Sequence, residues 1–498
     1  MCSLLARNWV VWVRRKRCWE FLLFRAESIS KERDKYKRDI GMIFTGWEGP
    51  LALLEHEVTQ REYEGCPVPE ALREKIDALN HHENTWDFET VDTLYRQLEQ
   101  LPRDLKFPYV QPNDLEGIRK ERPEGPRKLG EITEADLFDK FHGAWTGRAA
   151  GCALGKPVEG MGIMGREGMI GRQAIRTYLK NREHWPLDFY FTGADAGDGL
   201  KIHCPQSQRE NIAFMEPDDD IHYTLIALSV LEKFGPAFEW HNVANTWNTS
   251  LPYYAICTAE AQAIMNYNNA VPRKALSKWV TPEYTSTNRN PYREWIGAQI
   301  RADGWGYACA GNPELAAEFA YRDACWTHRA NGIYGEMMFA AIIAAAFVVD
   351  DAAELINIGL SEIPKNCRLS EACLLALDQV PKCQDFHEYM DWVELHYGEL
   401  NGVHTVNNAL VVLGSMIFGE MDFHQSICRS VEGGWDTDCN GATCGSIVGA
   451  STGTKDLNSS LVAPLNDTIR PNVIGFQEIS MSELAERTLK VYQSVAGK

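Results

Sequence analysis

Apolar residues recur at helical spacing along most of this chain. Segments 69–79 and 89–101 repeat them every three or four positions and contain few β-branched residues. Thr133 precedes another such segment, where it would serve as the N-cap of a helix. Ala-rich segments at 335–356 and 407–419 continue the pattern toward the C-terminus. Because strand patterns are weak, the sequence predicts an all-α fold.

Breaks in this pattern indicate three regions. Five prolines punctuate a charged connector that ends near residue 130: Pro102, Pro108, Pro112, Pro123 and Pro126. We therefore predict an N-terminal extension at 1–41, a helical region with its linker at 42–130, and a main domain at 131–498. Within the main domain, residues 160–215 are rich in Gly, Asp and aromatic residues, which is typical of long functional loops.

The N-terminal residues do not resemble a targeting segment. Residues 1–25 alternate short apolar runs with a basic cluster that follows the apolar stretch. A secretory signal has the reverse order, and a membrane span needs about 20 unbroken apolar residues. We therefore predict no membrane partner. The segment could form an amphipathic surface helix, or it could precede the true start, for which Met42 is a candidate.

Composition and charge narrow the class of protein. The 498 residues are 45% hydrophobic and 10% aromatic, as in a folded globular chain. Lys and Arg number 50 against 69 Asp and Glu, a net charge of -19 that argues against nucleic acid as a partner. The 14 cysteines form no CxxC pair, and several lie in apolar surroundings, such as Cys257, Cys325 and Cys373. Reduced and mostly buried thiols indicate a cytoplasmic protein.

The segment GAWTGRAAGCALGKPVEG aligns four glycines on one face of a helix: Gly143, Gly147, Gly151 and Gly155. Each costs about 1 kcal/mol relative to Ala in a helix interior, so we expect another group to approach the backbone closely. Packing against a neighbouring helix would meet that expectation. Pro157 then ends the helix and places Glu159 just beyond its C-terminal end.

Three adjacent carboxylates, Asp218, Asp219 and Asp220, precede an apolar run. The run at 221–234 carries the buried stripe of a helix that Gly235 ends. The helix dipole stabilises one such charge by about 0.3–1 kcal/mol, which is too little for three neighbouring carboxylates. A bound cation would offset their repulsion. The alternative is an exposed, capped helix start.

A second acidic pair lies in the segment GGWDTDCNGATCGSIVGA. Asp436 and Asp438 alternate in a Gly-flanked turn and precede a helix of small residues. Alternating Asp residues direct two oxygen ligands the same way, as hard divalent cations require. Together the two clusters supply five Asp carboxylates, enough to hold two metal ions about 3.5–4 Å apart.

Four further residues could contact a ligand. Arg301 could bind an anionic group, and Trp305 and Tyr307 could stack on a ring. His328, which precedes an Ala-rich segment, could contact a polar group. For all four, the alternative is ordinary packing or capping.

In this order, the motifs resemble the signatures of the ADP-ribosylglycohydrolase family, which includes the dinitrogenase reductase activating glycohydrolase. The Gly-rich opening that ends in PVEG, the DDxxxTLxxL helix start, the Thr-His pair and the GGxDTDxxxATxGxxxGA segment carry the resemblance over about residues 135–455. It implies an orthogonal bundle of helices whose central cleft binds two Mg2+ or Mn2+ ions.

The resemblance also implies roles for single residues. Asp219 and Asp220 match one pair of metal ligands, and Asp436 and Asp438 match the second pair. Glu159 matches a glutamate that contacts or gates the metal site. His328 matches a His near the ribose.

Two positions depart from the family pattern. Asp218 stands where Thr is usual and would add a negative charge to the metal site. Cys439 stands where a Thr hydroxyl coordinates metal, and sulfur is a poor ligand for Mg2+. We predict six metal ligands: Asp218, Asp219, Asp220, Asp436, Asp438 and Cys439.

We therefore predict a metal-dependent hydrolase that cleaves a glycosidic bond at the anomeric carbon of ADP-ribose or a related ribosyl substrate. The metal ions would hold the attacking water, while Glu159, Asp219 or Asp438 handles the proton. The substrate would be an ADP-ribosylated protein or a small ribosyl compound. The alternatives are a hydrolase of a small nucleoside or ribosyl phosphate, and a catalytically silent binding protein of the same fold.

Overall fold

The structure is a computed structural model that describes residues 47, 49–79, 87–130, 132–270, 280–457 and 459–497. The chain divides into two compact units, Met1–Leu105 and Lys106–Lys498. The predicted extension at 1–41 and the candidate start Met42 lie outside the described residues. The domain boundaries stay a prediction, although residues 106–130 belong to the second unit.

The first unit is helical where it is described. It contains α2 (Pro50–Tyr63), α3 (Glu70–Asp77) and α4 (Phe88–Glu99). The Asp87 side chain caps α4 by accepting a hydrogen bond from the Thr90 amide. The Tyr95 hydroxyl donates to Glu57 at 2.9 Å, which joins α4 to α2.

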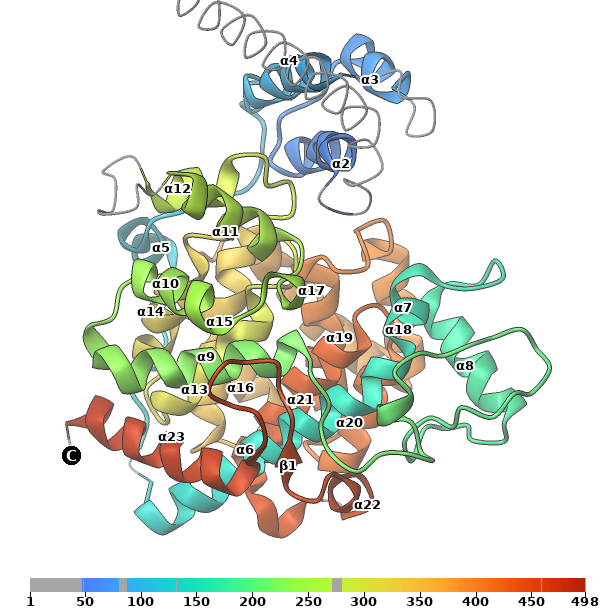
Figure 1. The fold of residues 1–498 in the computed structure, drawn as a ribbon, viewed down its shortest axis with the longest axis vertical. Helices are drawn as coiled ribbons and strands as arrows, with labels where there is room; N and C mark the ends of the chain where they lie inside the picture. The colour runs from blue at the N-terminus through green and yellow to red at the C-terminus, as the bar shows by residue number, and fades with distance from the viewer. Residues whose placement is uncertain are drawn as a thin grey trace, which may run out of the picture. The chain divides into compact units, whose positions relative to one another are not determined.

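The second unit is also built from helices (Figure 1), so the all-α prediction is confirmed. The α-helices are α5 (Leu115–Glu121), α6 (Glu134–Gly155), α7 (Glu159–Met164), α8 (Gly171–Asn181), α9 (Asp219–Phe234), α10 (Trp240–Ser250), α11 (Ala259–Ala270), α12 (Pro282–Thr287), α13 (Ala302–Ala308), α14 (Pro313–Ala324), α15 (Asn331–Ala346), α16 (Ala352–Leu360), α17 (Arg368–Gln379), α18 (Phe386–Tyr397), α19 (Thr405–Phe418), α20 (Phe423–Glu432), α21 (Thr437–Thr452), α22 (Ser459–Val462) and α23 (Met481–Ala496).

Short elements connect these helices. The 3-10 helices are η1 (Lys156–Val158), η2 (Pro205–Ser207), η3 (Gly235–Ala237), η4 (Tyr253–Ala255), η5 (Gln299–Arg301), η6 (Val380–Lys382), η7 (Thr454–Asp456) and η8 (Ala463–Leu465). Strands β1 (Thr468–Ile469) and β2 (Ile479–Ser480) pair antiparallel, with Thr468 opposite Ser480. Between α8 and α9, η2 interrupts the long loops that the composition predicts.

The Ala-rich helix α15 lies in the core of the second unit. All of its residues are buried. A helix that is apolar on every face is buried on every face, and its alanines let neighbouring helices approach closely. Most residues of α19 are buried as well, so the two Ala-rich segments form the interior.

Helices α6 and α21 pack backbone to backbone along their glycines (Figure 1). A Cβ atom added to Gly147 would lie 2.0 Å from the Gly445 carbonyl oxygen, and one added to Gly151 would lie 1.9 Å from that of Gly441. The reverse holds too, since a Cβ on Gly441 would lie 2.4 Å from the Gly151 oxygen. The close approach predicted from the glycine spacing is therefore confirmed, and its partner is α21.

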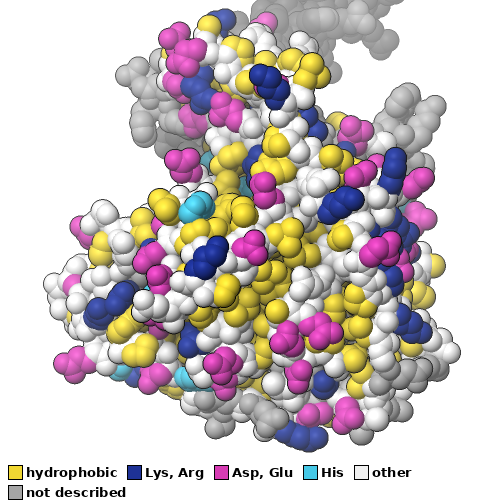
Figure 2. Space-filling model, turned by 180° about the vertical axis from the view of Figure 1, so that it is seen from behind, with side chains coloured by type: hydrophobic (Ala, Val, Ile, Leu, Met, Phe, Trp, Pro, Cys, Tyr) yellow, Lys and Arg dark blue, Asp and Glu magenta, His cyan; other side chains and the backbone are white. Residues whose placement is uncertain are grey.

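The surface carries charges of both signs (Figure 2), and two of the three cysteines expected in apolar surroundings are buried. On the face shown in Figure 2, basic side chains are scattered among acidic and hydrophobic ones. In the part of the chain that the structure describes, the helices lack the length and apolar character needed to cross a bilayer. Cys325 and Cys373 are buried as expected, whereas Cys257 is exposed because it lies in the loop before α11.

Candidate metal and active site

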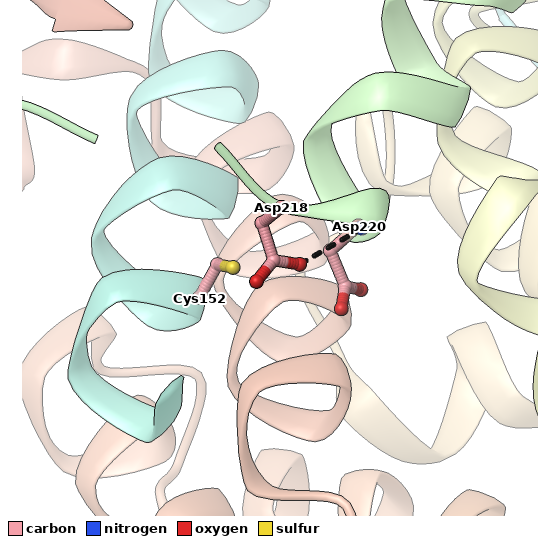
Figure 3. A group of neighbouring side chains, drawn as sticks. All are labelled: Cys152, Asp218 and Asp220. Carbon is pink, nitrogen blue, oxygen red and sulfur yellow. Dashed lines mark hydrogen bonds between the residues drawn. The ribbon is translucent and has the colours of Figure 1, made fainter. Parts of the chain in front are cut away.

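The C-terminal end of α6 meets the N-terminal end of α9. Asp218 is the N-cap of α9, and its Oδ1 accepts a hydrogen bond from the Asp220 amide at 3.0 Å. Figure 3 shows the Cys152 sulfur of α6 pointing toward the Asp218 carboxylate, with Asp220 beside it. Asp218 therefore serves as the cap, as the sequence allowed, and both Asp218 and Asp220 lie near α6.

Two basic side chains, Arg148 of α6 and Lys156 at its C-cap, bind this acidic segment. Lys156 Nζ donates to Asp218 Oδ2 at 2.5 Å. Arg148 donates from Nε to the Asp220 carbonyl at 2.7 Å and from Nη2 to Asp220 Oδ1 at 3.2 Å. Its Nη1 reaches Asp303 at 2.7 Å. These contacts stabilise carboxylates that would otherwise be buried without a counter-charge.

The second acidic pair lies at the start of α21. Gly434 and Trp435 both have positive φ, at 78° and 53°, which turns the chain sharply before Asp436. A Cβ on Gly434 would lie 2.8 Å from the Arg172 amide nitrogen, so the turn requires glycine there. Thr437 Oγ1 donates to the Gly155 carbonyl at 2.8 Å. This bond joins the start of α21 to the end of α6.

The two acidic segments converge into one cluster. Three groups have ligand atoms within 4.8 Å of one another: Cys152 with Asp218 and Asp220, Asp220 with Asp438 and Cys439, and Glu159 with Asp436 and Asp438. Asp220 and Asp438 each belong to two groups, so the groups are continuous. Of the six predicted metal ligands, five belong to these groups and Asp219 does not, so its role as a ligand stays a prediction.

Several carboxylate oxygens in the cluster have no hydrogen-bond partner. Among the described residues, these buried atoms include Asp220 Oδ2, Asp436 Oδ1 and Asp438 Oδ1. A buried carboxylate oxygen without a partner is strongly unfavourable unless a cation compensates it. Oxygen ligands of this kind suit hard divalent cations such as Mg2+ and Mn2+. The residues present therefore fit a metal site.

Burial and the neighbouring charges shift the pKa values of the carboxyl groups in the cluster. Burial, together with the charges of Asp218 and Asp438, raises the pKa of Asp219 to about 8. Burial and the charge of Asp218 raise the pKa of Asp438 to about 6. The charge of Asp438 and then burial raise the pKa of Glu159. Burial acts against Asp218 as well, but Lys156 holds its pKa below the ordinary value.

We expect the metal-free protein to lose stability between about pH 6.5 and about pH 8. The unfolded Asp carboxyl ionises near about pH 4, whereas folded Asp219 holds its proton to about pH 8. The folded state therefore binds more protons in this window, and its stability falls as pH rises. Because ligands must lose protons to bind a cation, Mn2+ should raise the melting temperature more at pH 8 than at pH 6.5.

Differential scanning fluorimetry in EDTA and in Mn2+ at both pH values measures this effect. Asp219→Asn should flatten the pH dependence in EDTA, because it removes one of the titrating carboxyls. Equal Mn2+ shifts at the two pH values would contradict the prediction.

Arg301 lies in a separate buried ion network. Its guanidinium pairs with Glu260, with Asp323 at 3.0 Å and with Glu336 at 3.3 Å. Trp305 Nε1 donates to Asp323 at 3.1 Å. Packing therefore accounts for the contacts of both side chains, and the predicted substrate-binding role stays a prediction.

Tyr307 and His328 are likewise buried among protein groups. The Tyr307 hydroxyl lies 2.6 Å from Ser446 Oγ. His328 Nδ1 lies 2.8 Å from Thr327 Oγ1, and its Nε2 lies 3.8 Å from Glu260. Burial and the neighbouring Arg301 hold the pKa of His328 well below its ordinary value, so the ring is neutral. Their contacts with substrate also stay predictions.

Sequence reasoning missed the side chains of α6 that face the cluster. Arg148, Cys152 and Lys156 lie four residues apart, one position after the glycines, so they form the neighbouring row of α6 and its C-cap. That spacing was a usable signal. The glycine row packs against a partner helix. The adjacent row of side chains must therefore face the groups next to that partner helix, which here are the acidic residues.

Comparison with known proteins identifies the family of the chain. Residues 133–496 match the model of the ADP-ribosylglycohydrolase family, and the chain therefore belongs to that family. A solved structure titled "ADP-ribosylglycohydrolase-related protein complex" shares 18% identity at a TM-score of 0.45, covering 72% of this chain and 99% of that chain. A comparison with curated proteins finds no match.

Proposed function

We propose that this protein is a metal-dependent hydrolase that cleaves an N- or O-glycosidic bond at the anomeric carbon of ADP-ribose or a related ribosyl group. The observation that carries the proposal is the set of buried, unpartnered carboxylate oxygens on Asp220, Asp436 and Asp438 among the described residues. Family membership supports the reaction class. The substrate would be an ADP-ribosylated protein or a small ribosyl compound, and the cytoplasm is the compartment we predict.

The buried Asp residues would hold Mg2+ or Mn2+ ions, of which the sequence predicts two. When bound, such ions neutralise the carboxylates and polarise oxygen atoms of the ligand. Asp220, Asp436 and Asp438 offer oxygen atoms for this purpose. Cys439 lies in the same cluster, but burial raises the pKa of its thiol, so it is a weak ligand for a hard ion.

Glu159 and Asp219 are suited to meet the substrate. Both are only partly buried, whereas Asp218, Asp220, Asp436 and Asp438 are buried. Because Asp438 raises its pKa, Glu159 can hold a proton and transfer it during bond cleavage. The negative charge of the cluster would stabilise the positive charge that develops on the ribose ring.

An activity screen tests the proposal. The purified protein would be incubated with an ADP-ribosylated peptide, a nucleoside and a ribosyl phosphate, each with Mg2+, Mn2+ or EDTA, and the products identified by mass spectrometry. Release of ADP-ribose that EDTA abolishes supports the proposal. Cleavage of the nucleoside or the ribosyl phosphate alone would favour the smaller substrate class, and no turnover with any of them would favour a silent binding protein.

Glu159→Gln should lower kcat by about 100-fold or more, because general acid–base groups contribute about 10²–10⁴ to rates. Its affinity for Mn2+ should change far less, since the buried Asp residues remain. Glu167→Gln is the matched control, because Glu167 is exposed in the loop that follows α7. A Glu159→Gln protein with normal kcat would remove this residue from the reaction.

A further inference from the structure

The acidic cluster already contains two side-chain cations on one side. Lys156 Nζ donates to Asp218 Oδ2 at 2.5 Å and to the Pro217 carbonyl at 2.6 Å. The side chains of Lys156 and Asp218 are only 13% and 5% exposed, so solvent scarcely screens their attraction. Arg148 binds Asp220 and the Ile300 carbonyl, the latter at 2.6 Å.

The two sides of the cluster therefore differ. On the side of α6 and α9, Lys156 binds Asp218 and Arg148 binds Asp220. The third member there is the Cys152 thiol (Figure 3), which is a poor ligand for a hard cation. On the side of α21, Asp436 Oδ1 and Asp438 Oδ1 have no partner within the described chain, and Glu159 lies beside them.

We infer that the Lys156 ammonium group takes the place of one divalent ion, so that the protein binds a single Mg2+ or Mn2+ on the α21 side. This inference rests on the proposed metal-dependent function and changes its metal count from two to one. Asp436 and Asp438, which share one ligand group at the start of α21, would hold the ion. Entry of a second ion beside Asp218 would displace Lys156 from Asp218 Oδ2 and leave a buried ammonium without its counter-charge.

Manganese stoichiometry tests the inference directly. Calorimetric titration of the full-length protein should give one Mn2+ per chain, and its electron paramagnetic resonance spectrum should be that of an isolated ion. Lys156→Met has a side chain of similar length and no charge, and it leaves Asp218 unpaired. This variant should bind two Mn2+ ions that couple magnetically.

Two further variants control for charge. Lys156→Arg keeps the cation and should bind one Mn2+. The double variant Lys156→Met with Asp218→Asn removes both members of the ion pair, so it should also bind one. Together with two ions in Lys156→Met, these results would show that the charge of Lys156, and not its packing, sets the metal count.

Two Mn2+ ions in the wild-type protein would overturn the inference, and so would a folded Lys156→Met protein that still binds one. If Lys156→Met does not fold, anomalous diffraction from a Mn2+-soaked wild-type crystal decides. One manganese peak with Lys156 beside Asp218 supports the inference, and a second peak at Asp218 overturns it. No Mn2+ binding by any variant would instead overturn the metal-dependent function itself.

Discussion

Replacing Asp438 with Asn should abolish both the binding of Mn2+ and the divalent-dependent hydrolysis. Asp438 belongs to two of the three ligand groups, and its Oδ1 is buried without a partner among the described residues. Loss of an outer-shell partner of a metal ligand typically lowers affinity or activity by about 10–100-fold. Loss of a ligand shared by two groups should therefore exceed about 100-fold in Mn2+ affinity, measured by calorimetry.

The same substitution should raise the melting temperature of the metal-free protein. At pH 7.5 the Asp438 carboxyl is largely ionised, because its pKa is only about 6. Replacing it by a neutral amide removes repulsion from Asp218 in the buried cluster. Asp188→Asn, at an exposed position, should alter neither property. An Asp438→Asn protein that binds Mn2+ normally would rule out the predicted site.

Replacing Gly151 with Ala should strongly destabilise the second unit. The new Cβ would lie 1.9 Å from the Gly441 carbonyl oxygen and 2.4 Å from its carbonyl carbon, so α6 and α21 would have to separate. Overpacking typically costs about 1–3 kcal/mol and occasionally more, and a clash with backbone belongs at the upper end. The gain in helix propensity, about 1 kcal/mol, is too small to offset it.

Chemical denaturation measures the loss, and Gly160→Ala is the matched control. Gly160 is also helical, in α7, but a Cβ there would meet its nearest atoms at 3.7 Å, an ordinary contact distance. The control should be neutral or slightly stabilised. If Gly151→Ala were as stable as the control, the two helices would not be packed backbone to backbone.

Much of the fold could be predicted from local sequence patterns. Thr133 caps α6, Gly235 ends α9, and the Ala-rich segments form α15 and α19, because each depends on residues within a few positions. The glycine row of α6 also predicted a close neighbour. Its partner, α21, could not be derived from spacing alone, since nearly 300 residues separate the two rows, about the span from Gly151 to Gly441.

The acidic residues of the candidate site could be predicted from the sequence, but the basic residues that pair with them could not. Neighbouring Asp residues repel one another, so the two acidic segments predicted a shared cation site for Asp220 and Asp438. Their counter-charges could not, because Arg148 and Lys156 reach the cluster only through the packing of α6 against α9 and α21. The ion pair of Arg301 with Glu260 could not be predicted from the sequence either, and the predicted contact of Arg301 with substrate stays a prediction.

The glycine contact between α6 and α21 also bears on how the proposed hydrolase could acquire a new specificity. With no side chain between the two backbones at these positions, main-chain contact sets the spacing between the end of α6 and the start of α21. Directed evolution toward another leaving group should therefore succeed by varying residues 165–215, whose chain leaves the site after Glu159 and returns at Asp218, while both glycine rows stay invariant in every active clone.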